Sequence, residues 1–438
     1  MKITRVCGRR LWDSRGRPTV EAEVTLTSGA VGRAIAPAGA SRGSREALDL
    51  RDGGARLGGL DVARALANLN GPMAAALIGV EAGDQAVVDA ALLALDPSPL
   101  KTLMGGNAMV ALSLACLHAG AAGAGVPLWH HVAALTGATP SIPLPEIQIF
   151  GGGAHAGRRV DVQDFMVMVP GAASFDEALE VTAEIYAAAG DLMKSAGKLA
   201  GVADEGGWWP AFDHTEQALD TMTRAIEMAG EKPGDRVVIS LDIAASEFGS
   251  GGRYRLAHEG RDLDTGQMID LLAGWIAAYP IASIEDPLAE DDTAGLAAFT
   301  ARFSDHIQII GDDCLVTNAA LVGQLAKARA CNAALIKVNQ AGTVTEALAA
   351  LAAAQRAGWR RVVSARSGES EDVSISHLAV GTGAGQLKVG SFARSERLAK
   401  WNECLRIAED PAAGTFVGGA PLAGTWWGRK SLEKRGKV

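Results

Sequence analysis

The amino-acid sequence predicts an α+β domain at the N-terminus, followed by a larger domain that is a TIM-type (β/α)8 barrel. Three features of the sequence support this prediction. Residues 3–35 alternate between apolar and polar positions, an Ala- and Leu-rich stretch with helical spacing follows, and the second part repeats short apolar runs. We place the N-terminal domain at residues 1–138, the barrel at residues 139–425 and a polar C-terminal tail at residues 426–438.

The N-terminal domain is expected to begin with an antiparallel sheet. The segment VEAEVTLTSGAVGRAIA at residues 20–36 has the period-two pattern of strands, and Ser28-Gly29 interrupts it as a pair typical of hairpin turns. Over residues 61–135 the apolar residues recur instead at helical spacing. A sheet followed by helices is typical of an α+β domain.

The second part contains six short apolar runs, each bounded by polar or turn residues. Helical stretches separate most of them, which is typical of β/α units and of a parallel sheet. The residues at or near the C-terminal ends of the runs are Asp242, Glu285, Asp312, Lys337, Ala365 and Lys388. After a first separation of 43 residues, they follow at intervals of 27, 25, 28 and 23, close to what a strand, loop, helix and return loop require.

A barrel places the C-terminal ends of all its strands on one face, where these side chains would converge. A doubly wound open sheet is the alternative, but it would spread the strand ends along a line, so we prefer the barrel. Three carboxylates that meet at its mouth, those of Asp242, Glu285 and Asp312, would repel one another unless a cation lies between them. Mg²⁺ is the hard divalent ion that such oxygen ligands favour. For each acid alone, a solvated or ion-paired strand end is the alternative.

Two lysines, Lys337 and Lys388, lie within otherwise apolar runs. Burial of an ammonium group is costly unless the charge is paired or removed. A lysine beside metal ions and a second ammonium is shifted toward its neutral form, which is a usable base. The alternative is a lysine whose stem packs in the core while its ammonium reaches solvent.

Composition and charge exclude several classes of function. The chain has 438 residues, 48% of them hydrophobic and 21% charged, which is typical of a globular protein. It has 41 basic and 50 acidic residues, a net charge of −9 and no long basic cluster, so nucleic acid is not an expected partner. The five cysteines form no Cys-x-x-Cys pair, which favours a reducing cytoplasm. Because we find no signal peptide and no apolar stretch of about 18 residues, we expect a soluble cytoplasmic protein with no membrane partner.

Motifs along nearly the whole chain resemble those of the enolase family. The matching segments are DSRGRPTVEAEV at 13–24, PAGASRGSREALDLRDG at 37–53, GGGAHAG at 151–157, VQDF at 162–165, ADEGG at 203–207, LDIAASEF at 241–248, SIEDP at 283–287, GDDCLVTN at 311–318, IKVNQAGT at 336–343, SARSGESED at 364–372 and GQLKVGSFARSERLAKWN at 385–402. The resemblance implies Mg²⁺-dependent removal of a proton α to a carboxylate. Two Mg²⁺ sites are expected, one structural and one substrate-dependent.

The resemblance also implies roles for the residues that match. Asp242, Glu285 and Asp312 are expected to hold the structural Mg²⁺. Ser41, on a mobile loop, is expected to help hold the second Mg²⁺ once substrate is bound.

On the substrate, Lys337 is expected to be the base that removes the proton, and Lys388 to hold the substrate carboxylate. Glu205 is the expected acid that assists departure of the 3-hydroxyl. Arg366 and Ser367 match the pair that binds phosphate.

The sequence departs from the family on the side that handles the departing hydroxyl. The family has His directly before the phosphate-binding Arg-Ser pair, where this chain has Ala365. The family has Glu after the barrel-motif Gln, whereas here Gln163 is followed by Asp164, which is one methylene shorter. His155 matches the loop histidine that closes on the substrate. Loss of a positioned acid or base typically costs about 10²- to 10⁴-fold in rate, although neighbouring groups can compensate.

Other departures add cationic and aromatic side chains near the same mouth. They are Arg42, Arg158, Arg159, Trp208 and Trp209. Guanidinium groups can bind additional phosphate, phosphonate or carboxylate oxygens, and tryptophans can stack a nucleobase. For each residue alone, a neutral surface substitution is the alternative.

Three hypotheses follow from these departures. The first is an enolase relative that forms an enolpyruvyl product from a small anionic phospho- or phosphono-carboxylate, which can also carry an activating nucleotide. The named candidate is a carboxyphosphonoenolpyruvate synthase of phosphinothricin-type biosynthesis. The second is ordinary interconversion of 2-phosphoglycerate and phosphoenolpyruvate, with Ala365 and Asp164 tolerated. The third is a non-catalytic scaffold, which would not need the acids and lysines. The resemblance also implies a homodimer formed through the small domain, with Glu21 and Arg406 at its interface.

Overall fold

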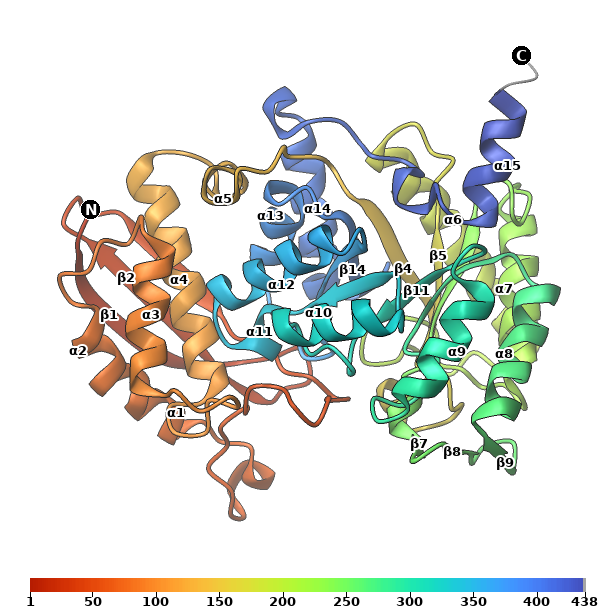
Figure 1. The fold of residues 1–438 in the computed structure, drawn as a ribbon, viewed down its shortest axis with the longest axis horizontal. Helices are drawn as coiled ribbons and strands as arrows, with labels where there is room; N and C mark the ends of the chain where they lie inside the picture. The colour runs from red at the N-terminus through yellow and green to blue at the C-terminus, as the bar shows by residue number, and fades with distance from the viewer. Residues whose placement is uncertain (436–438) are drawn as a thin grey trace.

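The first domain of the computed structural model, which describes residues 1–435, is an antiparallel sheet with helices packed on it (Figure 1). Its strands β1 (Ile3–Trp12), β2 (Pro18–Leu26) and β3 (Val31–Ile35) pair in the order β1-β2-β3. Gly29 has the positive φ, 85°, that the tight β2–β3 turn requires. The sheet predicted at the start of the chain is therefore present.

Helices cover one face of this sheet. They are α1 (Ala63–Asn68), α2 (Ala74–Leu77), α3 (Gln85–Leu95), α4 (Gly106–Ala124) and α5 (Leu128–Thr136). Helix α4 is long and apolar enough to cross a membrane, so the expectation that no apolar stretch reaches that length is wrong. The helix is mostly buried and packs against β2 and β3. A Cβ atom on Gly32 would lie 2.2 Å from Ala119 N, so glycine is what allows β3 to approach α4 this closely.

The second domain is a closed eight-stranded barrel, as predicted. In chain order its strands are β4 (Leu144–Gly151), β5 (Asp164–Met168), β6 (Val238–Asp242), β10 (Ile281–Glu285), β11 (Gln308–Gly311), β12 (Ala333–Ile336), β13 (Arg360–Ser364) and β14 (Gly385–Ser391). The helices around it are α6 (Phe175–Ser195), α7 (Thr215–Met228), α8 (Thr265–Ala278), α9 (Thr293–Phe303), α10 (Ala319–Ala328), α11 (Val338–Ala341), α12 (Val344–Arg356), α13 (Ser374–Gly381) and α14 (Ser395–Ala408). A small sheet of β7 (Gly249–Ser250), β8 (Arg253–Leu256) and β9 (Arg261–Asp264) lies between β6 and α8 in the sequence.

The barrel is not all parallel, which corrects the expectation of a parallel sheet. Strand β5 is antiparallel to both of its neighbours, β4 and β6. Residues 152–163 join β4 to β5 with only a short 3-10 helix, so the chain has no crossover helix and must run back along β4. Helices α6 and α7 then return the chain to the same end of the barrel before β6 begins.

The segment expected as a polar tail folds in part onto the barrel. Residues 426–435 form helix α15 (Trp426–Arg435), whereas residues 436–438 lie outside the described residues. The indole of Trp426 donates to the Ile281 carbonyl at 2.7 Å. Trp427 is buried against the apolar cluster at the N-terminal ends of the strands, so the segment closes that end of the barrel.

Polar contacts fix the N-terminal domain to the barrel. The buried Asp89 of α3 accepts hydrogen bonds from the backbone N–H of Thr345 at 2.8 Å and from its hydroxyl at 2.6 Å. Lys101 Nζ lies 2.9 Å from Glu346 Oε1. The loop at residues 38–46 has its own contacts with the barrel, from the Ser44 N–H to Glu290 and from Arg45 to the Cys314 carbonyl.

Candidate active site

The C-terminal ends of the barrel strands bring predicted acids and a predicted lysine together. Asp242 ends β6 and Glu285 ends β10, and the two residues are paired in register on adjacent strands. Lys388, on β14, reaches across the barrel, where its Nζ lies 2.7 Å from Asp242 Oδ2 and 2.8 Å from Glu285 Oε2. Asp164 Oδ2 lies 3.5 Å from the same ammonium. One lysine is thus the counter-ion of three buried carboxylates.

Asp312 and Lys337 form a second buried ion pair at the same mouth. Asp312 follows β11, and Lys337 follows β12 at the start of α11. The Lys337 ammonium donates to one Asp312 oxygen, and Gln340 Nε2 donates to the other at 2.8 Å. Thr317 Oγ1 accepts the backbone N–H of Lys337 at 2.9 Å, which fixes this residue at the rim.

Burial and charge act in opposite directions on the two lysines. Burial lowers the pKa of Lys337, but the charges of the neighbouring acids, Asp312 first and then Glu285, together outweigh it, so the pKa is raised. Burial also lowers the pKa of Lys388, but Asp242 and then Glu285 raise it well above its ordinary value. Both lysines are therefore ammonium ions in this structure. A neutral Lys337 requires another countercharge for Asp312.

The acids at the mouth fit a hard divalent cation. Asp242, Glu285 and Asp312 offer only oxygen donors, as Mg²⁺ prefers. Burial and then the Asp242 charge raise the pKa of Glu285 well above its ordinary value. Glu285 Oε1 and Gln163 Oε1 are buried and have no hydrogen-bond partner among the described residues. A small cavity lies beside Asp242 and the two lysines, and Ser41 lines it from the loop of the N-terminal domain.

The predicted phosphate-binding residues follow β13, with Arg366 held by the N-terminal domain. Its Nη1 lies 2.9 Å from both Glu46 Oε2 and Asn339 Oδ1, and its Nη2 donates to the Ser41 carbonyl at 3.1 Å. The Ser367 side chain lines the cavity. Arg366 therefore links the loop at residues 38–46 to the barrel, in addition to its predicted role.

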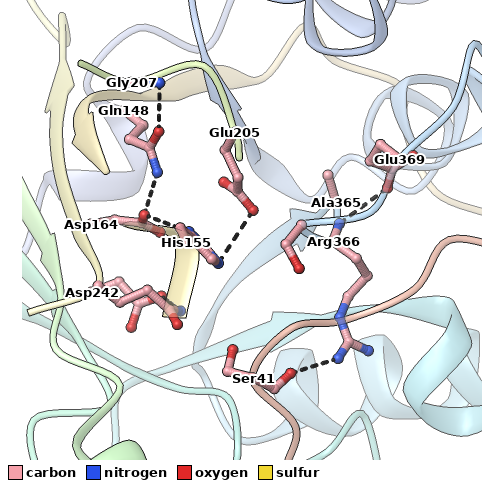
Figure 2. Close-up of polar contacts among 12 residues, drawn as sticks. Ser41, Gln148, His155, Asp164, Glu205, Gly207, Asp242, Ala365, Arg366 and Glu369 are labelled. Carbon is pink, nitrogen blue, oxygen red and sulfur yellow. Dashed lines mark hydrogen bonds and ion pairs between the residues drawn. The ribbon is translucent and has the colours of Figure 1, made fainter. Parts of the chain in front are cut away.

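The opposite wall of the cavity carries an imidazole between two carboxylates (Figure 2). His155 Nδ1 lies 3.3 Å from Asp164 Oδ1, and His155 Nε2 lies 3.7 Å from Glu205 Oε1. Burial lowers the pKa of His155, but Glu205 and then Asp164 outweigh it, so the pKa is raised. Burial raises the pKa of Asp164, but His155 outweighs it, so the pKa is lowered. The structure thus favours an imidazolium that bridges Asp164 and Glu205.

Ala365 does not open a large space in this structure. It is buried and lines a cavity of about 20 Å³, which holds about one water molecule. The loop that carries Ser41 and the loop that carries His155 both line this cavity. A cavity of this size is too small for a phosphoglycerate, so the site must widen before such a substrate binds.

The two added arginines of the His155 loop have partners outside the cavity lining in this structure. Arg158 Nη2 lies 2.7 Å from Glu247 Oε2, and Arg159 Nη1 lies 3.3 Å from His258 Nδ1. Asp161 of the same loop accepts the backbone N–H of His258 at 3.2 Å. These contacts hold the loop against β8, β9 and the segment after β6.

Trp208 also has its partners outside the cavity lining. Its ring stacks on Tyr186 of α6 with centroids 4.8 Å apart, and its indole donates to the Tyr186 carbonyl at 2.8 Å. Trp209 is half-buried near Gly157 and is not part of the cavity lining. Arg42 is exposed and does not line the cavity either.

Two residues that contact this site have no role in the sequence-based prediction. Gln148 of β4 donates to Asp164, and Arg397 of α14 donates to the Arg366 carbonyl at 2.6 Å and lies 3.9 Å from Glu205. The sequence around each residue indicates that its side chain is buried. Gln148 has an inward position in an apolar strand, and Arg397 falls on the buried stripe of α14.

Comparison with known protein families gives two matches. Residues 3–132 match the family model described as Enolase, N-terminal domain. Residues 139–423 match the model described as Enolase, C-terminal TIM barrel domain. Together these matches cover both domains and every site residue described above.

Proposed function

This chain belongs to the enolase family, and we propose that it is a Mg²⁺-dependent enzyme that enolises a 2-phosphoglycerate-type acid and releases an enolpyruvyl product. One observation carries the proposal. Lys337, Lys388 and Asp242 line one wall of the cavity, with Asp312 and Glu285 as further partners of the lysines. The Asp164–His155–Glu205 group lines the other wall, where Asp164 also lies 3.5 Å from Lys388. A substrate between these walls would meet a base on one side and an acid on the other.

On the first wall, Lys337 is proposed to take the proton from C2 of the substrate. Lys388, whose ammonium contacts Asp242 and Glu285 in this structure, would bind the substrate carboxylate when Mg²⁺ is held by these acids. When bound to Asp242, Glu285 and Asp312, Mg²⁺ supplies positive charge that lowers the cost of the negative charge that develops on that carboxylate. Lys337 can act as a base only when its ion pair with Asp312 is released.

On the second wall, Glu205 is proposed to deliver a proton to the departing 3-hydroxyl. The bonds from C2 to hydrogen and from C3 to oxygen break, the C2–C3 double bond forms, and the hydroxyl leaves as water. His155 lies 3.7 Å from Glu205, and the neighbouring carboxylates raise the pKa of His155, which favours a protonated imidazole on this wall although residue 365 is alanine. This observation also favours the second candidate function, the ordinary interconversion of 2-phosphoglycerate and phosphoenolpyruvate.

For the physiological substrate we propose a phosphono-carboxylate, as in a carboxyphosphonoenolpyruvate synthase of phosphinothricin-type biosynthesis. The support is local: Ala365 is small and directly precedes Arg366, the expected phosphate ligand. The same loss of water from a glycerate whose 2-oxygen carries a carboxyphosphono group would give that product directly. Because Trp208, Arg158 and Arg159 have other partners, a nucleotide-activated substrate has less support than this smaller one.

A substrate comparison tests the proposal. Purified protein with Mg²⁺ is assayed for enolpyruvyl product from 2-phosphoglycerate, from its carboxyphosphono analogue and from a nucleotide-activated phosphonoformate with 2-phosphoglycerate. We expect turnover that EDTA abolishes, with a higher kcat/KM for the carboxyphosphono compound. A higher kcat/KM for 2-phosphoglycerate would establish ordinary enolase activity. No turnover of any of these compounds would leave the non-catalytic scaffold.

We also propose a cytoplasmic homodimer, as expected for this family. Glu21 and Arg406, the expected interface residues, have partners within the chain: Arg9 contacts Glu21, and Arg406 Nη1 lies 2.8 Å from Glu403 Oε2. Light scattering on the purified protein tests the dimer, and a monomer at micromolar concentration would overturn it.

A further inference from the structure

Gln148 lies at the centre of the contacts on the second wall of the cavity. Its side chain is fully buried. Gln148 Oε1 accepts the backbone N–H of Gly207 at 2.9 Å, and Gln148 Nε2 donates to Asp164 Oδ1 (Figure 2). Gly207 is two residues after Glu205, so one amide contacts both the loop of the expected acid and the carboxylate beside His155.

The chemistry of the two partners fixes the orientation of this amide. The Gly207 N–H can only donate, so it must face the amide oxygen, and the amide nitrogen then faces Asp164. A carboxylate at Asp164 accepts that hydrogen bond. No other side chain of this length offers an acceptor at one position and a donor at the other without a charge.

The backbone around Gln148 is shaped for its side chain. A Cβ atom on Gly207 would lie 2.3 Å from Gln148 Oε1, and one on Gly151 would lie 3.1 Å from the same atom. Ser391 Oγ donates to the Gln148 carbonyl at 2.6 Å, which fixes the strand at this point. The amide is therefore held in place from both ends.

Asp164 in turn orients the imidazole of His155. Its Oδ1 atom, which accepts from Gln148, also lies 3.3 Å from His155 Nδ1, and the other imidazole nitrogen faces Glu205. The His155 carbonyl accepts the Asp204 N–H at 3.1 Å, so the two loops are joined by their backbones as well.

We propose that Gln148 is a positioning residue for the departure of the hydroxyl. It holds Asp164 so that His155 faces Glu205, and it ties the loop of Glu205 to the same point. The inference rests on the proposed function, because it assumes that proton removal and hydroxyl departure occur on opposite walls. Loss of Gln148 should therefore impair the second event and spare the first.

The experiment measures both events in the same sample. Entry of solvent deuterium at C2 of unreacted 2-phosphoglycerate or its carboxyphosphono analogue reports proton removal, and enolpyruvyl product reports departure of the hydroxyl. In Gln148→Leu we expect product formation to fall about 10- to 100-fold while deuterium entry is retained. Gln148→Glu keeps the acceptor for Gly207 but places a carboxylate against Asp164, so a similar loss is expected.

A matched control is Gln386→Leu. Gln386 is another fully buried barrel glutamine, which pairs with Gln308 and does not line the cavity. If this variant is less stable, both rates should fall together, because only the folded fraction changes. The ratio of the two rates therefore separates a positioning role from a structural one.

Two results would overturn the inference. One is a Gln148→Leu variant that loses both rates in equal proportion, and the other is a variant that keeps both. If the wild-type protein shows neither deuterium entry nor product with either substrate, the proposed function itself is wrong, and this inference fails with it. Wild-type activity with an unchanged ratio in Gln148→Leu would overturn only the role of Gln148.

Discussion

The ammonium of Lys388 lies 2.8 Å from Glu285 Oε2, at the place where the acids of the barrel mouth converge. Asp242, paired with Glu285 on the neighbouring strand, contacts the same ammonium at 2.7 Å. Without another cation, the lysine is the charge that keeps these acids together. Binding of Mg²⁺ to the acids would release Lys388 toward a substrate carboxylate.

Replacement of Lys388 by methionine should therefore have opposite effects on metal binding and on turnover. We expect Lys388→Met to bind Mg²⁺ roughly tenfold more tightly, because a competing positive charge is gone. Product formation should be lost, because the substrate carboxylate has no ammonium partner. Calorimetric titration with Mg²⁺ and a product assay test the two effects. Unchanged or weaker Mg²⁺ binding would show that the lysine does not compete for these acids.

The His155 loop should depend on Asp161 for its closed position. Asp161 accepts the backbone N–H groups of Ala257 and His258 at 3.1 and 3.2 Å. In Asp161→Ala we expect KM to rise about 3- to 10-fold, because the two hydrogen bonds that hold the His155 loop are lost. Mg²⁺ affinity should be unchanged, because Asp161 is not one of the acids expected to hold the metal. Asp262→Ala, an exposed change on the same small sheet, is the control. Equal KM values for the two variants would contradict the role of Asp161.

A histidine at position 365 should not improve turnover of 2-phosphoglycerate. The cavity beside Ala365 is about 20 Å³, far less than an imidazole needs, and His155 lines it already. We expect Ala365→His to displace His155 and to give a kcat/KM at or below that of the wild type. Ala365→Ser, a much smaller change, should stay near the wild-type value. A large increase in kcat/KM in the Ala365→His variant would show that His155 does not already supply the role of the missing histidine.

Glu403 should make stability depend on acid pH. The hydrogen bond from His377, opposed by burial and supported by Arg406, lowers the pKa of Glu403 to about 2. The unfolded value is about 4.3, so the stabilisation is present above that pH and is lost as the pH falls toward 2. In Glu403→Gln we expect Tm to be about 1 to 2 °C lower near pH 6, and the difference to shrink near pH 3. Thermal unfolding of Glu409→Gln, an exposed change, gives the baseline, and a pH-independent difference would contradict the assignment.

Sequence patterns could predict the barrel and much of its mouth, because an ionisable residue at the end of an apolar run marks both the strand and its direction. Asp242 and Glu285 were located in this way. The direction of β5 could not be predicted, because it depends on the lack of a crossover helix between two similar apolar runs. The local pattern of apolar and polar residues could not predict that the Trp208 side chain would pack against α6 and not against the cavity.

Side-chain partners were harder to predict than positions. Arg158 and Arg159 follow His155 closely in the sequence, yet their partners are Glu247 and His258, which lie about 90 to 100 residues later in the chain. Gln148 has an inward position that the strand pattern reveals, but only the fold brings it to Asp164. Contacts between distant segments therefore decide which polar residues belong to the site.

The most direct test of the proposed function is entry of solvent deuterium at C2 of the substrate, measured with Mg²⁺ for the wild type and for Lys337→Ala. We predict Mg²⁺-dependent entry in the wild type and a loss of at least about 10²-fold in the variant, with the fold and Mg²⁺ binding retained. Entry at the wild-type rate in Lys337→Ala would contradict the assignment of this lysine as the base. No entry in the wild type, with Mg²⁺ bound and either substrate present, would contradict enolisation itself.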